Sequence, residues 1–298
     1  MSSIAAMVKE LRERTGSGLL ECKKALAAAD GDMETAIENM RKAGLAKADK
    51  KSSRIAAEGI VGVKVSADGT SAAMVDVNSE TDFVAKGEDF IAFVNDVTEL
   101  VLNNDIDSNE ALLAASLTSD ETVDGKRRSL IAKLGENISI RRFEKYTSAT
   151  GGNACYLHGS TIGVLVELAD NNPALGKDIA MHVAAIKPQC IAEADVSADV
   201  IAKEKEIIAG RIKTEGEESG KVKPDEIIEK MATGRIKKFL SEITLNGQAF
   251  VKDDKTTVGA LVKSKGTSVV RFTRFEVGEG IEKVEEDFAA EVMAQVNA

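Results

Sequence analysis

The sequence comprises 298 residues, which predicts about two domains. Hydrophobic types make up 43% and charged types 30%, so the chain can bury a sizeable core, and disorder over its whole length is disfavoured. The formal net charge of −10 disfavours DNA or an anionic membrane surface as the main partner.

Several classes of site are missing from the sequence. Its three cysteines, Cys22, Cys155 and Cys190, lie far apart, which is typical of a reducing compartment and no disulfide framework. No apolar run reaches the roughly 18 residues of a membrane span and no signal peptide precedes the first amphipathic pattern, so we expect a cytoplasmic protein. There is no zinc-type Cys/His spacing, no phosphate-binding glycine loop and no nucleophile motif. We therefore expect no metal, no cofactor and no catalytic residue, and a function carried by protein surfaces.

Residues 1–54 are predicted to form a small three-helix unit followed by a linker. The first helix has an apolar face with the spacing i, i+3, i+4, i+7, made by Ile4, Met7, Val8 and Leu11. The second helix covers about residues 19–29. The third begins after the capping residue Asp32 and is expected to end at Gly44. The small, polar and basic residues 47–54 predict a linker.

Residues 55–148 change to a mixed pattern. Apolar and polar residues alternate on both sides of Asp68-Gly69, which predicts a β-hairpin. An amphipathic helix follows over about residues 90–101. A short helix near residues 126–134 and a strand over residues 137–143 complete a first lobe.

The same order of elements recurs in residues 149–278. A hairpin around Gly159-Ser160 is followed by a helix that ends before Pro188, and later by a short helix and a strand over residues 269–277. The two halves share this plan although their residues do not match. We therefore predict an α+β fold with a duplicated, two-lobed core.

The second lobe contains an insertion at about residues 195–240. Two amphipathic helical segments are separated by Gly216, Gly220 and Pro224, which predicts a projecting antiparallel helical hairpin. The last segment, residues 279–298, carries Val284, Phe288 and Val292 at helical spacing. It predicts a C-terminal helix.

Six segments, in the same order as in the family, resemble the bacterial translation elongation factor Ts family. They are residues 8–16, 21–26, 80–86, 179–185, 247–251 and 274–282. The segments run from end to end of the chain, which makes the resemblance far more specific than a single motif.

The resemblance implies a guanine-nucleotide exchange factor without covalent chemistry. Its partner would be elongation factor Tu, in the GDP-bound and nucleotide-free forms. The factor would displace the partner's Mg²⁺ and promote the exchange of GDP for GTP. Any association with aminoacyl-tRNA and the ribosome would be indirect, through that partner. The resemblance also implies a ubiquitin-associated-like (UBA-like) helical head, paired lobes and an antiparallel coiled coil.

The family's wedge, implicated in dislodging Mg²⁺ from the partner, corresponds to Thr81-Asp82-Phe83-Val84. Mg²⁺ requires near-octahedral oxygen ligands. A small shift of the elements that hold it therefore weakens the binding of both the ion and the nucleotide. The residues alone favour another interpretation, in which Thr81 caps a helix whose first turn buries Phe83. The resemblance favours an exposed Phe83.

The resemblance also implies two sets of partner contacts. They are Leu11, Arg12, Leu19 and Leu20 in the head, and His158, Gly159, Ile162 and Gly163 in the second lobe. The alternatives are that the leucines belong to the ordinary head core, that Arg12 is a solvated charge and that His158 lies in a solvated turn. Adjacent leucines cannot face one small core equally, so one of Leu19 and Leu20 is expected to be exposed. His182, in an apolar helix, is interpreted as structural.

Two other functional classes remain open from the sequence. The first is a UBA-like scaffold or adaptor protein that binds a helical partner without exchange activity. The second is a carboxylate enzyme that uses Glu80 and Asp82, although no histidine, lysine or metal ligand pairs with them nearby in the sequence. Release of a fluorescent GDP analogue from elongation factor Tu separates the first class from an exchange factor.

Overall fold

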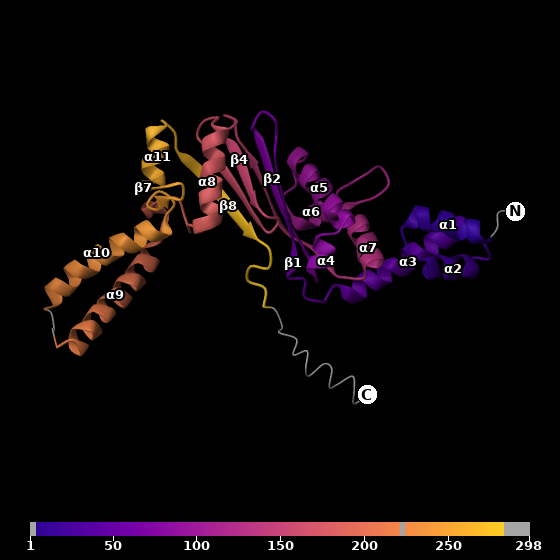
Figure 1. The fold of residues 1–298 in the computed structure, drawn as a ribbon, viewed down its shortest axis with the longest axis horizontal. Coiled ribbons are helices and arrows are strands. Elements are labelled where there is room, and N and C mark those ends of the chain that lie inside the picture. Colours follow the sequence, from indigo (N-terminus) through magenta and orange to yellow (C-terminus); the bar gives the residue numbers. More distant parts are fainter. Residues whose placement is uncertain (1–3, 221–223, 283–298) are drawn as a thin grey trace. The chain divides into compact units, whose positions relative to one another are not determined.

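A computed structural model describes residues 4–220 and 224–282, without the side chains of residues 45–47. The fold mixes helices with small sheets, which confirms the predicted α+β class (Figure 1). The chain divides into two compact units. The first takes the chain up to Gly62, Val75–Phe143 and the chain from Phe275; the second takes Val63–Met74 and Glu144–Arg274. The predicted C-terminal helix lies mostly outside the described residues.

The first unit holds the N-terminal helices and most of one sheet. Its helices are α1 (Ile4–Thr15), α2 (Leu19–Ala28), α3 (Met33–Lys51), α4 (Asp82–Ala85), α5 (Glu88–Asn103), α6 (Asn109–Ala114) and α7 (Val123–Leu134). The sheet has the order β1-β2-β3, with strands β1 (Glu58–Val65), β2 (Ser71–Ser79) and β3 (Ile138–Thr147).

Helices α1 to α3 form a small head with a core of its own. The Asp32 carboxylate accepts a hydrogen bond of 2.7 Å from the Thr35 amide, so Asp32 caps α3 as expected. The buried side chains of this core are Val8, Leu11, Cys22, Leu26, Ala29 and Ala36.

The predicted end of α3 at Gly44 and the predicted linker are wrong. The helix continues to Lys51 and packs on α7. A Cβ at Gly44 would lie 3.1 Å from the Ala132 Cβ, so glycine serves here for close approach of two helices and not for a helix end. Arg128 also pairs with Asp49 at 3.0 Å, and the Lys51 ammonium donates to the Gly135 carbonyl.

The first sheet is covered by α5. A Cβ at Gly62 on β1 would lie 2.2 Å from the Thr98 hydroxyl oxygen, so helix and strand touch at that point. The β1–β2 turn is closed by Asp68, whose carboxylate accepts from the Ser66 hydroxyl and from the Thr70 amide and hydroxyl. These bonds, the Ser66 bond first, lower the pKa of Asp68 to about 2.

The second unit is built around a sheet of order β4-β5-β8. Its elements are β4 (Asn153–His158), β5 (Ile162–Leu168), α8 (Pro173–Ile186), the 3-10 turn η1 (Glu193–Asp195), α9 (Ala198–Glu218), α10 (Asp225–Ile243), β6 (Ala249–Phe250), β7 (Asp253–Thr257), α11 (Val258–Ser264) and β8 (Val269–Glu276). In both three-stranded sheets the last strand pairs with the second strand of the hairpin.

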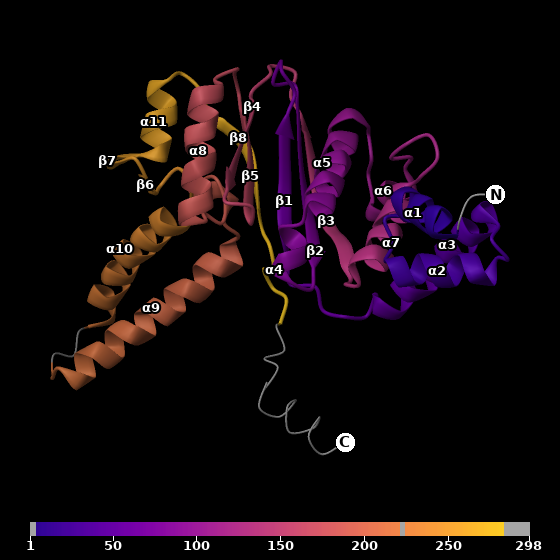
Figure 2. The ribbon, with the colours of Figure 1, turned by 45° about the vertical axis from the view of Figure 1, so that its right-hand side comes forward.

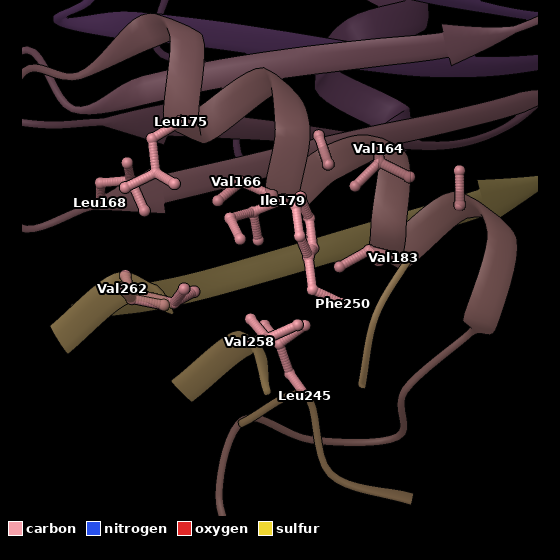
Figure 3. Close-up of a cluster of buried hydrophobic side chains, with 13 residues drawn as sticks. Val164, Val166, Leu168, Leu175, Ile179, Val183, Leu245, Phe250, Val258 and Val262 are labelled. Carbon is pink, nitrogen blue, oxygen red and sulfur yellow. The ribbon is translucent and has the colours of Figure 1, made fainter. Parts of the chain in front are cut away.

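The core of the second unit lies between β5, α8 and α11. Figure 3 shows Ile179 and Val183 of α8 gathered with Val164 and Val166 of β5 around Phe250. A Cβ at Gly176 would lie 2.5 Å from the Ala154 Cβ, so α8 approaches β4 as closely as α5 approaches β1.

Tyr146, near the end of β3, is 2% exposed in the second unit. Its hydroxyl lies 2.7 Å from the Thr273 hydroxyl, and the Arg271 guanidinium lies 3.9 Å from the centre of its ring. Burial raises the pKa of Tyr146 to about 12.

Helices α9 and α10 pack side by side and form a helical hairpin (Figure 2). The apolar seam between them is built from Ile208, Ile212, Ile228, Ala232, Ile236 and Leu240. Val200 and Ile207, two further apolar residues of α9, are 45% and 40% exposed. Adjacent residues on a helix point about 100° apart, so only one member of each pair 200/201 and 207/208 can enter the seam.

Candidate protein-binding site

The predicted wedge lies where β2 ends and α4 begins. Thr81 has extended backbone angles, and its hydroxyl accepts from the Val84 amide at 3.5 Å, so it caps a helix of only four residues. The first turn of this helix presents Phe83 to solvent with 83% of its side chain exposed, and buries Ala85 instead. The cap prediction is confirmed, and the interpretation that Phe83 is buried is wrong.

Two glutamates connect this turn to the segment that follows α7. The Glu136 carboxylate accepts from the Thr81 amide at 2.9 Å and from the Thr81 hydroxyl at 2.7 Å. In the reverse direction, the Glu80 carboxylate accepts from the Asn137 amide at 2.6 Å. We call this pair of contacts, formed by Glu80, Thr81, Glu136 and Asn137, the carboxylate clasp.

Asp82 points to a different partner. Contrary to the prediction that no lysine pairs with it nearby in the sequence, its carboxylate pairs with the Lys86 ammonium at 2.6 Å, one helical turn away. This hydrogen bond lowers the pKa of Asp82 and raises that of Lys86. Glu80 pairs with Arg54 at 3.4 Å besides its bond to Asn137. The two carboxylates do not face a common group, which gives no support to a carboxylate enzyme.

The head presents an apolar surface at the start of α2. Leu19 is 58% and Leu20 72% exposed, so both leucines face solvent where one was expected to. Arg12 on α1 is exposed as well. The structure corrects the prediction for Leu11, which is fully buried in the head core. Its side chain supports the surface from beneath and is not available to a partner.

The second predicted contact belongs to the second unit, at the turn between β4 and β5. His158 and Gly159 are exposed, and the backbone of Gly159 has a positive φ of 60°, which favours glycine. The Tyr156 hydroxyl lies 3.2 Å from Nδ1 of His158 and fixes the ring beside the turn. Ile162 is partly buried against the core and Gly163 is buried within β5, so only the turn itself is open to a partner.

His182 is fully buried in the second unit and its role is structural, as predicted. The Val251 amide donates to Nδ1 at 3.1 Å, so the proton of the neutral ring is on Nε2 and is donated to the Gln248 side-chain oxygen at 2.9 Å. Burial lowers the pKa of His182.

Comparison with known proteins identifies the family. A sequence profile described as Elongation factor TS matches residues 80–279. The chain is 60% identical to "Elongation factor Ts" of Methylococcus capsulatus over the full length of both proteins. It is 56% identical to "Elongation factor Ts" of Alkalilimnicola ehrlichii and 51% to that of Legionella pneumophila, each over 99% of both chains. The chain belongs to the elongation factor Ts family.

For this member of the elongation factor Ts family, sequence reasoning predicted a wedge at residues 81–84 but missed the residues that brace this turn. Glu136 and Asn137 follow Gly135, a left-handed helix-capping residue with a φ of 81°. No local pattern indicates their contact with Thr81 and Glu80, which are distant in the sequence. Within residues 4–220 and 224–282, no group of three His, Cys, Asp or Glu side chains could hold a metal ion. No helix in this described part combines the length and apolar character of a membrane span.

Proposed function

We propose that this protein is a guanine-nucleotide exchange factor for elongation factor Tu, acting in the cytoplasm. Membership of the elongation factor Ts family over the full length of its relatives supports this function. The structural observation that carries the proposal is Phe83, a large apolar side chain 83% exposed on a braced turn. An aromatic residue held outward on a rigid support is suited to enter a pocket of a partner.

The proposed mechanism is displacement of the partner's Mg²⁺. Mg²⁺ requires near-octahedral geometry and bridges the nucleotide phosphates to the GTPase. Insertion of Phe83 moves the GTPase segment that holds the ion, and loss of the ion weakens the binding of GDP to the GTPase. In this mechanism the nucleotide stays on the GTPase, because the sequence has no phosphate-binding glycine loop. Because the coupling is reciprocal, GDP must weaken the binding of this protein to the GTPase by the same factor.

The remaining predicted contacts hold the two proteins together. In the proposal Arg12, Leu19 and Leu20 dock on the GTPase, and the turn at His158 and Gly159 forms a second contact. Both surfaces are exposed, as this role requires. Contact with aminoacyl-tRNA and the ribosome is indirect, through elongation factor Tu.

The domain organisation is part of the same proposal. A UBA-like head comprises residues 1–54, and the two lobes comprise residues 55–148 and 149–278. An antiparallel coiled coil inserted at about residues 195–240 is supported by the paired helices α9 and α10. The C-terminal helical module predicted for residues 279–298 lies mostly outside the described residues.

The test is stopped-flow release of a fluorescent GDP analogue from elongation factor Tu. The wild-type chain should accelerate release, and Phe83→Ala should slow the accelerated release at least about tenfold, because truncating a central aromatic contact typically costs about 2 kcal/mol. The melting temperature should change little because the side chain is exposed. Val200→Ala, which also truncates an exposed apolar residue, is the matched control and should leave release unchanged.

The adaptor alternative predicts a different result. An adaptor would bind elongation factor Tu through the head without accelerating GDP release. Binding without acceleration by the wild-type chain would therefore replace the exchange function by the adaptor function. A folded Phe83→Ala protein with wild-type release kinetics would remove Phe83 from the mechanism.

A further inference from the structure

The wedge helix is too short to be held by its own hydrogen bonds. Helix α4 has four residues, whereas isolated helices shorter than about 12 residues are marginal in water. Its orientation must therefore come from the contacts of its cap and its base. Ala85 provides an apolar anchor at the C-terminal end. The N-terminal end depends on how the backbone of Thr81 is held.

The N-terminal end shows half of a common helix-start motif. In a capping box, a Ser or Thr caps the helix and a Glu or Gln three residues later bonds to the amide of the cap residue. Thr81 is the cap, but the position three residues later is Val84, whose side chain cannot accept a hydrogen bond. The amide of Thr81 is bonded instead by Glu136, 55 residues away in the sequence.

Glu136 also fixes the hydroxyl of Thr81. The Thr81 hydroxyl donates to Glu136 at 2.7 Å, which leaves its lone pairs for the Val84 amide of the helix. The carboxylate therefore holds both the backbone and the side chain of the cap residue. Charge-assisted hydrogen bonds of this kind are stronger than neutral ones.

The second half of the carboxylate clasp connects the same turn to the end of the head. Glu80 is bonded to the Asn137 amide, and the Asn137 side chain donates to the Arg54 carbonyl at 2.7 Å and to the Ser52 carbonyl at 3.4 Å. Asn137 is 5% exposed. The segment before Phe83, the start of β3 and the chain leaving α3 are thus joined at one place.

We propose that Glu136 is a positioning residue for Phe83: its carboxylate completes the helix cap of Thr81 and thereby sets the direction of the wedge. The inference rests on the proposed exchange function, since Phe83 must act on a partner for its direction to matter. Glu136 acts through Thr81 and does not itself touch the nucleotide or Mg²⁺.

The test is a double-mutant cycle on GDP release from elongation factor Tu, with Glu136→Ala, Phe83→Ala and the double variant. Glu136→Ala should slow release about threefold to tenfold, because both hydrogen bonds to Thr81 are lost. In the Phe83→Ala background the same change should have no further effect. A thermal melt of each variant measures the stability loss, which should be equal in both backgrounds.

Two further variants identify the cause. Glu136→Gln keeps an acceptor for the Thr81 amide and can donate to its hydroxyl, so it should retain wild-type release within about twofold. Glu121→Ala is the matched control, since Glu121 is a partly exposed glutamate beyond the other end of α7 that bonds Ser129. It should leave release unchanged. If Glu136→Ala melts below the assay temperature, Glu136→Asp, one methylene shorter, takes its place in the cycle.

Each outcome decides the inference. Equal slowing by Glu136→Ala in both backgrounds would overturn it, because Glu136 would then act independently of Phe83. Slowing by Glu136→Gln as large as that by Glu136→Ala would also overturn it, since the charge and not the geometry would matter. If Phe83→Ala slows release and Glu136→Ala does not, the inference fails and the proposed function stands. If the wild-type chain does not accelerate release, the proposed function fails first.

Discussion

Three phenylalanines close together in the sequence have opposite environments. Phe83 is 83% exposed, whereas Phe90 and Phe93 on α5 are buried within the first unit. The difference follows from the short helix α4, whose single turn can bury only one side and uses Ala85 for that purpose. An exposed aromatic side chain of this size is what the proposed insertion into a partner requires.

The buried His182 makes a prediction about pH. Its pKa is lowered in the folded state by burial, while the unfolded chain has a pKa near 6.5. As the pH falls below about 6.5 the unfolded state binds the proton first, so the contribution of His182 to the free energy of unfolding is full at pH 7 and is lost as the pH falls toward the folded pKa. The measurement is an NMR titration of the His182 ring.

The chain has only two histidines, so His158→Gln leaves the His182 signal alone in the spectrum and serves as the control. We expect the ring of His182 to titrate below 6.5 while the protein stays folded. A titration at or above 6.5 would show that burial does not lower the pKa of this ring.

Helices and strands agree with the sequence-based prediction where a single local pattern is strong. The apolar periodicity predicted α5 and α8, and Asp68-Gly69 predicted the first hairpin. The helix end predicted at Gly44 was wrong because glycine can either end a helix or allow two helices to approach closely. Only the contact with Ala132 of α7 shows that the second applies here. The short α6, β6 and β7 have too few residues to show a period. The wedge was predicted from its motif, whereas the carboxylate clasp could not be predicted because Thr81 and Glu136 are 55 residues apart.

Glycines inside helices provide a test at the scale of elements. Gly210 in α9 and Gly234 in α10 are exposed, and a Cβ on either would meet nothing within 4 Å. Alanine at each position should stabilise the helical pair by about 1 kcal/mol, because glycine loses more backbone entropy on helix formation. Hydrogen exchange of the α9 and α10 amides should slow correspondingly.

Gly176→Ala in α8 is the matched control for these substitutions. Its Cβ would lie 2.5 Å from the Ala154 Cβ, so alanine should destabilise the second unit instead. Stabilisation by Gly176→Ala, or loss of stability with Gly210→Ala and Gly234→Ala, would contradict this prediction. It would show that the space around the Cβ does not decide whether alanine raises or lowers the free energy of unfolding.

At the scale of the whole molecule, the exposed predicted contacts are distributed over both units. The wedge and the leucine pair belong to the first unit, and the turn at His158 belongs to the second. Contacts on both units are what the proposed binding to a large partner would use.

Removal of residues 1–54 tests how independent the head is. The truncated chain should bind elongation factor Tu more weakly and should also have a lower melting temperature, because Arg128 loses Asp49 and Asn137 loses the Arg54 carbonyl. A shorter truncation, of residues 1–32, removes α1 and α2 but keeps these two contacts and is the control for stability. An unchanged melting temperature after the longer deletion would show that α3 contributes nothing to the fold of the remaining chain.

The packing of Tyr146 gives the second unit an optical signal of its own. The chain has no tryptophan and two tyrosines, so its near-ultraviolet absorbance comes almost entirely from Tyr146 and Tyr156. Because burial raises the pKa of Tyr146 to about 12, its phenolate should form only at very high pH while this unit stays packed. Earlier appearance of its phenolate absorbance would report loosening of this unit. Because the chain lacks indole fluorescence, any such emission from a complex would come from the partner alone.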